Sequence, residues 1–238
     1  MRSVSELKIK LFADGADKAQ ILQAQASPLI KGFTTNPTLM RAAGVKDYET
    51  FAHEVLAAVT DKPISFEVFA DDFPEMERQA HKIAGWADNV YVKIPITNTK
   101  KEPSLELIRR LSHSGVKVNV TAILSLEQVQ GASEALAGGA PSVVSVFAGR
   151  IADTGLDPVP LMAEALKHVV PHPGMELLWA SPRELLNIFQ ANDIGCHIIT
   201  ATDGVLSKLK VVGKELNQYS LETVQMFYND AAHSGYKL

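Results

Sequence analysis

The chain has 238 residues, of which 46% are hydrophobic and 21% charged, so its core is large enough for one barrel or two smaller domains. Its 23 basic and 27 acidic residues give a net charge of −4 without a basic block, and we therefore expect no nucleic-acid partner. It has neither a signal-peptide pattern nor an apolar run of the ~18 residues that a membrane span needs, which predicts a cytoplasmic protein without a membrane partner.

Eight short β-like stretches occur along the chain, each followed by a segment with helical character, and no linker rich in Pro, Gly or Ser separates them. The stretches lie at 7–14, 30–36, 63–70, 90–96, 116–122, 142–148, 175–181 and 196–202. Strands that alternate with helices pair in parallel through right-handed crossovers, and eight such units can close on themselves. This pattern predicts an α/β fold with a single (β/α)8 TIM barrel domain over 1–238.

The segments between the strands fit helices on their own terms. Apolar residues recur at three- and four-residue spacing over 72–86, 104–114 and 124–137, and Pro158 suits the first turn of a helix that continues to Val169. An additional C-terminal helix is expected over 218–233, packed on the barrel or on a neighbouring subunit. A doubly wound open sheet is the alternative fold, but the residues after the first strand do not form its glycine-rich phosphate-binding turn.

One lysine interrupts the apolar run at 90–96. Because alternate side chains of a strand point to opposite faces, Lys93 shares a face with Tyr91 and Pro95, opposite the row of β-branched residues. A lysine held in such surroundings loses hydration, which favours the neutral amine that attacks carbonyl groups. Taken alone, Lys93 also fits a strand-end lysine whose stem packs while its amine reaches water.

Further polar residues recur at the carboxyl ends of the other strands, where (β/α)8 barrels carry their active sites. They are Asp14, Thr34, Asn36, Glu67, Asn119, Thr121, Ser145, Arg150, Ser181 and Arg183. Each has a structural alternative, such as a helix cap at Asn36 or a capping box formed by Ser181 and Glu184. Seven strands with polar residues at one end nevertheless indicate a pocket, since burying a carboxylate and an amine without a functional need is costly.

The chemistry of a neutral lysine suggests roles for these residues. Its attack on a ketone gives a carbinolamine that must lose water, for which Glu67 and the Thr121 hydroxyl are the candidates. The resulting iminium withdraws electrons, so a nearby carbon–carbon bond can break if Asp14 removes a hydroxyl proton. Asn36, Asn119 and Ser145 would bind substrate hydroxyls. Arg150, Arg183 and Ser181 at a helix start would hold a terminal anion such as phosphate.

At these residues the chain resembles the transaldolase family, in its small-subunit branch that also contains the fructose-6-phosphate aldolases. The resemblance covers nearly the whole chain and lies in ordered motifs. These are Phe12-Ala13-Asp14, Gly32-Phe33-Thr34-Thr35-Asn36-Pro37, Val92-Lys93-Ile94-Pro95, Asn119-Val120-Thr121, Ser145-Val146-Phe147-Ala148-Gly149-Arg150 and Ala180-Ser181-Pro182-Arg183.

The resemblance implies that Lys93 is a Schiff-base lysine, Asp14 the acid/base at the cleaved bond, and Glu67 with Thr121 the holders of a catalytic water. It also implies transfer of a dihydroxyacetone unit from fructose 6-phosphate or sedoheptulose 7-phosphate to an aldose phosphate, in the pentose phosphate pathway and without a metal or organic cofactor. A homo-oligomer is implied too, often a decamer of pentamer rings in this branch.

Two positions bear on the choice between transfer and simple cleavage. The related aldolases typically carry Gln where this chain has Glu67, and Tyr where it has Phe147. Glu67 and Phe147 therefore favour transfer over the release of free dihydroxyacetone. Departures near Gly15 and at Pro182 concern the anion end, so a differently substituted sugar, such as a sulfonated one, is a further alternative.

Other classes of protein fit the sequence less well. The Lys-Thr-Ser-Thr-Gly setting of deoxyribose-phosphate aldolases is absent, and the seven histidines are too scattered to predict a metal site. The single cysteine, Cys196, excludes an internal disulfide and is expected to be buried. A barrel that binds a sugar phosphate without turning it over would use Arg150, Ser181 and Arg183, but it would not explain Lys93 beside two acids.

Overall fold

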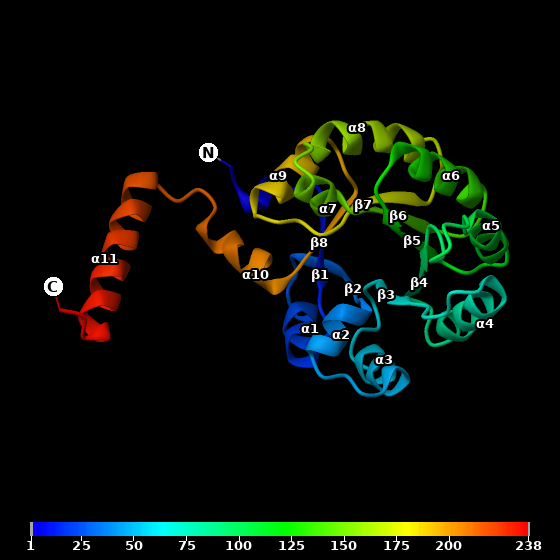
Figure 1. Cartoon of the computed structure of the whole chain (residues 1–238), viewed down its shortest axis with the longest axis horizontal. Coiled ribbons are helices and arrows are strands. Elements are labelled where there is room, and N and C mark those ends of the chain that lie inside the picture. The colour runs from blue at the N-terminus through cyan, green and yellow to red at the C-terminus, as the bar shows by residue number, and fades with distance from the viewer. Residues whose placement is uncertain (1, 238) are drawn as a thin grey trace.

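The computed structural model describes residues 2–237 and contains a closed barrel of eight parallel strands in the order β1 to β8, with helices around the outside (Figure 1). The strands are β1 (Lys10–Asp14), β2 (Ile30–Thr34), β3 (Ile64–Glu67), β4 (Val90–Pro95), β5 (Val118–Ile123), β6 (Ser142–Val146), β7 (Met175–Trp179) and β8 (Ile198–Ala201). β1 pairs with both β2 and β8, which closes the barrel. The predicted (β/α)8 fold is therefore confirmed.

Helices follow the strands along the chain. They are α1 (Lys18–Gln25), α2 (Pro37–Ala42), α3 (Tyr48–Leu56), α4 (Phe73–Ala84), α5 (Leu105–His113), α6 (Leu126–Leu136), α7 (Ala148–Asp153), α8 (Pro158–Val169), α9 (Leu186–Asp193), α10 (Asp203–Leu206) and α11 (Leu216–Ser234), with short 3-10 turns η1 (Val4–Glu6) and η2 (Ser207–Val211). Several are preceded by an Asp, Glu, Asn or Ser residue whose side chain accepts a hydrogen bond from a backbone N–H of the first turn. Asp72 accepts from the Glu75 N–H in this way, and Ser125 from the Gln128 N–H. Pro158 occupies the first turn of α8 as predicted.

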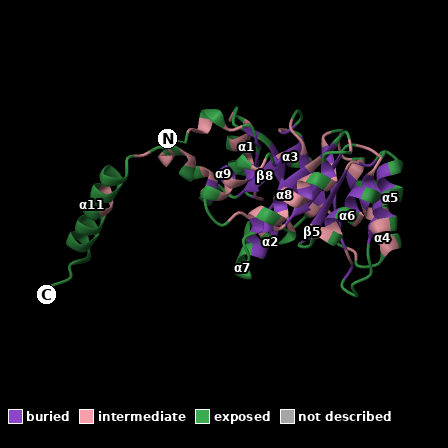
Figure 2. Cartoon of the chain, turned by 90° about the horizontal axis from the view of Figure 1, so that it is seen from above, coloured by how far each residue is buried: buried purple, intermediate pink, exposed green. Residues whose placement is uncertain are grey.

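The main core lies between the strands and the helices. Ile64, Phe66, Val92, Ile94 and Leu177 on the outward strand faces are at most 1% exposed, and they pack against the apolar sides of the helices. Buried residues are concentrated along the strands and the adjoining parts of the helices (Figure 2). Burying each of these large apolar side chains stabilises the fold by about 1.5–3 kcal/mol. This explains why several strands are continuous apolar runs: helices cover one face and the barrel interior covers the other.

The barrel interior carries a separate and smaller apolar cluster, formed by Phe12, Val143, Leu178, Ala180 and Ile198. Gly32 lies directly against the Phe12 ring, and a Cβ atom at this position would overlap the ring atoms. The absence of a side chain on β2 thus lets Phe12 fill the barrel. Polar side chains are grouped at one end of this interior, toward the carboxyl ends of the strands.

The chain beyond β8 leaves the barrel through α10 and η2, and α11 projects away from it (Figures 1 and 2). None of the α11 residues is buried. Four of its apolar or aromatic side chains are each at least 60% exposed: Leu216, Val224, Phe227 and Tyr228. Of the two predicted places for this helix, packing on the barrel is therefore wrong for the single chain. Within residues 2–237, no helix is both long and apolar enough to span a membrane.

Candidate active site

A cavity of about 560 Å³ opens at the carboxyl ends of the strands. All twelve residues predicted for the site line it: Asp14, Thr34, Asn36, Glu67, Lys93, Asn119, Thr121, Ser145, Phe147, Arg150, Ser181 and Arg183. They come from seven different strands or the segments that follow them, so the barrel gathers residues up to 169 positions apart, as between Asp14 and Arg183, into one pocket.

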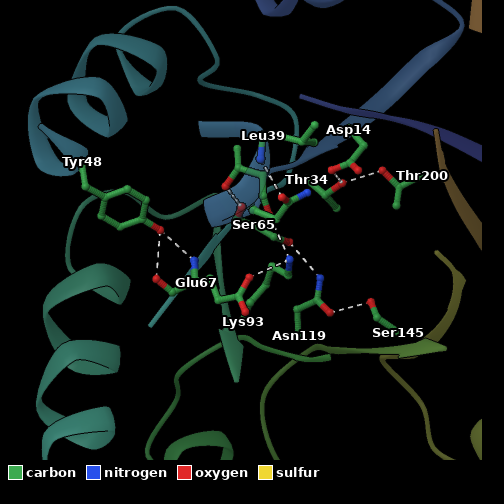
Figure 3. A network of polar contacts seen from close by, with 12 residues as sticks. Asp14, Thr34, Leu39, Tyr48, Ser65, Glu67, Lys93, Asn119, Ser145 and Thr200 are labelled. Carbon is green, nitrogen blue, oxygen red and sulfur yellow. Dashed lines mark hydrogen bonds and ion pairs between the residues drawn. The ribbon is translucent and has the colours of Figure 1, made fainter. Parts of the chain in front are cut away.

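Lys93 points into this cavity from β4 and is only 6% exposed. Its Nζ lies 3.1 Å from Glu67 Oε2 and donates to the Thr35 carbonyl oxygen over 2.9 Å (Figure 3). Glu67 reaches the amine because β3 and β4 pair in register, with Glu67 opposite Lys93. At this distance the Glu67 carboxylate can accept a proton from the ammonium group, which an amine must lose before it can attack a carbonyl.

Asp14 lies at the end of β1 and accepts a 2.8 Å hydrogen bond from the Thr34 hydroxyl, which in turn is 2.6 Å from the Thr200 hydroxyl. Burial raises the pKa of Asp14, and the Thr34 hydrogen bond, the Lys93 charge and Asn36 only partly oppose this effect. A carboxyl group with a raised pKa in a polar cavity is suited to proton transfer near neutral pH.

Asn119 on β5 connects side chains of β3 and β6 across the barrel floor. Its amide nitrogen donates to the Ser65 hydroxyl over 3.0 Å, and its carbonyl oxygen accepts from the Ser145 hydroxyl over 2.7 Å (Figure 3). The three side chains are buried, so this set of hydrogen bonds holds Asn119 in one orientation at the cavity wall. Asn119 and Ser145 are therefore pre-oriented by the protein before any ligand binds.

The Thr121 hydroxyl lies at the cavity with no hydrogen-bond partner within residues 2–237, although the residue is only 2% exposed. A buried hydroxyl without a partner at a cavity is free to bind a water or a ligand group. Next to it, β5 departs from regular pairing with β6 between Val120 and Ile123, where Ala122 adopts a positive φ of 63°.

This irregularity corrects one expectation. The alternation of side chains predicts Ala122 on the outer face with Val118 and Val120, but Ala122 lines the cavity instead. A residue in a left-handed conformation interrupts the two-residue period of the strand, and such local bulges often occur beside active sites.

The two arginines lie at the rim of the cavity. Arg183 is held by Asp153, with its Nε donating to Oδ1 over 2.9 Å and a second contact from the other end of the guanidinium group. This pairing lowers the pKa of Asp153, which stays charged. The Arg150 guanidinium lies 5.3 Å from the centre of the Phe147 ring, a cation–π distance that limits the directions in which it points.

Ser181 does not begin a helix, contrary to the sequence-based expectation. α9 begins only at Leu186, and the residue before it makes no side-chain cap. Ser181 instead adopts a positive φ of 59°, and its carbonyl oxygen lies so close to Gly149 that a Cβ there would overlap it. Gly149 and Ser181 thus bring together the segments after β6 and β7, from which Arg150 and Arg183 both line the cavity.

Asn36 also has the structural role that the sequence suggested as an alternative. Its side-chain oxygen accepts from the Leu39 N–H over 2.9 Å and caps α2, while the residue lines the cavity. Phe147 directly precedes α7 at the cavity wall, and its N–H donates to the Ile123 carbonyl oxygen. Both residues are therefore fixed by the backbone around the pocket.

Four residues of the site and its support were not predicted. Ser65 and Thr200 belong to the inward-facing rows of β3 and β8, and Thr202 follows directly after β8. The same alternation that selected Glu67 could have identified them. Tyr48 lies outside the barrel on α3, where only the fold brings it to Glu67. No pattern in the sequence indicates that contact.

The histidines do not gather at the cavity. Within the described part of the chain, no three His, Cys, Asp or Glu side chains are placed to hold a metal ion. Cys196 is buried as expected, and burial raises the pKa of its thiol to about 12.

Together, fold and site define a (β/α)8 barrel in which a buried lysine shares one cavity with two carboxyl groups at the carboxyl ends of the strands. Comparison with solved structures shows the same fold in mandelate oxidase, with a TM-score of 0.55 over 92% of this chain and 79% of that chain, at 17% identity. At this level of identity the likeness concerns the fold alone.

Sequence comparison is more specific. Residues 11–237 match the model of the transaldolase/fructose-6-phosphate aldolase family. Probable transaldolases from Dehalococcoides mccartyi, Streptococcus agalactiae and Methanococcus maripaludis are 36%, 34% and 35% identical to it over 84% of this chain and 89–90% of theirs. The chain belongs to the transaldolase/fructose-6-phosphate aldolase family and is an enzyme of transaldolase type.

Proposed function

We propose that this enzyme transfers a dihydroxyacetone unit from a ketose phosphate to an aldose phosphate through a Schiff base on Lys93. The observation that carries the proposal is the buried Lys93 amine, 3.1 Å from Glu67 and in the same cavity as the raised-pKa Asp14. A barrel that only binds sugar phosphates needs the rim arginines but has no use for this arrangement. Burying an amine beside carboxyl groups costs free energy, and a catalytic role explains why the protein retains them.

The first half of the reaction forms the iminium. Lys93 Nζ, after transfer of a proton to Glu67, adds to the donor's ketone carbon and gives a carbinolamine. Loss of its hydroxyl group as water requires a proton, which Glu67 returns through a water molecule held with the Thr121 hydroxyl. The unpartnered state of that hydroxyl in the structure supports this assignment.

The second half breaks and remakes a carbon–carbon bond. Asp14 removes the proton from the hydroxyl on the second carbon from the iminium carbon. The bond between that carbon and the carbon next to the iminium then breaks, and its electron pair moves into the iminium to form an enamine. An aldose phosphate is released. The enamine then adds to the aldehyde of the acceptor, Asp14 returns the proton, and water releases the new ketose from Lys93. No cofactor is required for these steps.

Substrate hydroxyls would bind Asn36, Asn119 and Ser145, with Thr34 orienting Asp14. The terminal phosphate would bind Arg150, Arg183 and Ser181 at the rim. Fructose 6-phosphate and sedoheptulose 7-phosphate are the proposed donors, which would place the enzyme in the pentose phosphate pathway of the cytoplasm. The test is a coupled assay with each donor, with and without an aldose phosphate acceptor. Product that forms only with acceptor supports transfer, while equal turnover without acceptor supports an aldolase, and turnover of only a sulfonated donor would reassign the anion.

Phe147→Tyr is predicted to raise the release of free dihydroxyacetone relative to transfer. Phe147 lines the cavity, and a phenol there could protonate the enamine carbon before an acceptor arrives. The ratio of dihydroxyacetone to transferred product, measured by chromatography with acceptor present, reports the change. Phe147→Leu serves as the control, because it alters the wall without adding a hydroxyl. An unchanged ratio in the tyrosine variant would count against the assigned role of this position.

The enzyme is proposed to be a homo-oligomer, as the decamers of this branch suggest, with α11 packed on a neighbouring copy. The wholly unburied α11 supports this, because a helix with Leu221 and Phe227 each at least 50% exposed gains little from folding alone. Phe227→Glu is therefore expected to lower the solution mass in size-exclusion chromatography with light scattering. Gln225→Glu on the same helix controls for added charge. A monomeric unmodified chain would contradict the proposal.

A further inference from the structure

The backbone of Glu67 lies where the sheet stops being regular. Along β3, the N–H and C=O groups of alternate residues face β2 and β4, and those of Ser65 face β2, where the Thr35 N–H donates to the Ser65 carbonyl oxygen over 3.2 Å. Glu67 follows two residues later and therefore faces the same side. Its own partner would have to come from the residues just after Thr35.

Those residues have left the sheet. β2 ends at Thr34, Asn36 caps α2, and Pro37 occupies its first turn without an N–H group to donate. Glu67 thus has a half-buried N–H and C=O on the side of β2 with no strand to pair with, while β4 pairs with the other side of β3. Such unpaired backbone groups are costly and must find a partner elsewhere.

The Tyr48 hydroxyl supplies both missing hydrogen bonds. It accepts from the Glu67 N–H over 2.8 Å and donates to the Glu67 carbonyl oxygen over 3.0 Å (Figure 3). One phenol thereby takes the place of a neighbouring strand. Burial raises the pKa of Tyr48, so the hydroxyl remains protonated and keeps both contacts at neutral pH.

The ring that carries this hydroxyl is itself held in place. It packs edge-on against Phe69 with ring centres 4.4 Å apart, against Trp86 at 5.7 Å and against Phe66 at 6.1 Å. Tyr48 is also the first residue of α3, whose start is capped by Asp47 accepting from Thr50. The packing of the ring and the capped start of α3 therefore both hold the hydroxyl group in place.

We infer that Tyr48 is a positioning residue for catalysis, which locks the backbone of Glu67 so that its carboxylate stays against Lys93 in the cavity that Thr121 also lines. This inference rests on the proposed function, because Glu67 must be the proton carrier for Tyr48 to matter to the rate. Tyr48 lies outside the substrate cavity and touches no reacting atom. The effect of its hydroxyl group is thus transmitted through the two backbone hydrogen bonds to Glu67.

Tyr48→Phe removes the hydroxyl and keeps the ring among its aromatic neighbours. We expect it to slow iminium formation and lower kcat by roughly 10- to 100-fold, since misplacing a catalytic group by about 1 Å can cost on the order of 100-fold. The KM for the donor should change little, because the rim arginines and the hydroxyl-binding residues are untouched. Rates are expressed per active site, counted by borohydride trapping with dihydroxyacetone, so a partly folded preparation still gives a usable number.

A double-mutant cycle separates positioning from a general loss of structure. In a Glu67→Ala background the carboxylate is gone, so adding Tyr48→Phe should lower the remaining rate by less than about 2-fold, whereas independent effects would multiply. Phe69→Leu is the matched control, because it disturbs the same aromatic cluster but keeps the hydroxyl, and it should retain kcat within about 2-fold.

An equal loss in both backgrounds, or a Tyr48→Phe enzyme with unchanged kcat, would overturn the role of Tyr48. Failure of the proposed function looks different: the unmodified enzyme would then give no borohydride adduct on Lys93 and no product in the transfer assay, whatever residue occupies position 48.

Discussion

Lys93→Met is expected to lower kcat/KM by about 10³-fold or more while leaving the barrel folded. Methionine fills the space of the lysine stem but cannot form an iminium, so the covalent route is lost and only binding remains. Glu67 loses its partner in this variant, but its side chain is 17% exposed to the cavity, and water can solvate it there. Donor turnover in the coupled assay measures the loss, and circular dichroism confirms the fold.

Lys10→Met is the matched control for this substitution. Lys10 also lies on a barrel strand and pairs with a carboxylate, Glu176, over 2.8 Å, but it is half exposed and does not line the cavity. Its replacement should leave kcat/KM near that of the unmodified enzyme. Comparable losses in the two variants would show that Lys93 matters only for structure.

Asp14→Asn is expected to lower the transfer rate by about 10²- to 10⁴-fold, the usual contribution of a general acid or base. Lys93 remains intact in this variant, so the donor should still form an iminium, which then accumulates because the carbon–carbon bond cannot break. The measurement is the amount of donor-derived adduct trapped on Lys93 by borohydride during turnover. A variant that turns over normally, or that traps no adduct at all, would contradict the role given to Asp14.

The same substitution should raise the thermal stability at neutral pH. Because burial raises the pKa of Asp14, the folded protein holds a proton there more tightly than the unfolded chain, whose value is near 3.8. The stability contributed by this group is therefore fully present below the unfolded pKa and is lost as the pH rises through the folded pKa. Asp14→Asn removes this loss, so its Tm should exceed that of the unmodified enzyme at pH 7 and match it in acid. Active-site groups commonly lower the stability of the folded protein while they serve its activity.

The pH dependence of activity follows from the same pKa. As a base, Asp14 must be ionised, so kcat/KM should fall on the acidic side at a pH above that of an ordinary aspartate.

The barrel and most of the pocket could be predicted because both follow from alternation along single strands. Val92 and Ile94 face the helices while Lys93 faces inward, as the strand period requires. The limits of the strands were less accurate: the stretches predicted at 63–70 and 196–202 are shorter in the structure, since their ends turn into loops or helix caps. The β-branched residues of a stretch do not show at which residue its pairing with the neighbouring strand ends.

The irregular parts of the site could not be predicted from a regular period. Ala122 and Ser181 both adopt positive φ values, which only their three-dimensional neighbours enforce, and each one redirects the chain at the pocket wall. Asp153 and Tyr48 come from helices, and nothing in their local sequence shows that they contact Arg183 and Glu67. Residues that act through others depend on packing between distant elements, which appears only once the barrel is closed.

The most direct test of the proposed mechanism is borohydride reduction of the unmodified enzyme in the presence of fructose 6-phosphate, followed by peptide mass spectrometry. A covalent route predicts one stable secondary amine, carrying the mass of the reduced three-carbon unit or of the whole donor, on the peptide that contains Lys93. An enzyme that turns over the donor yet carries no adduct, or carries it on another lysine, would contradict the central claim that Lys93 is the nucleophile.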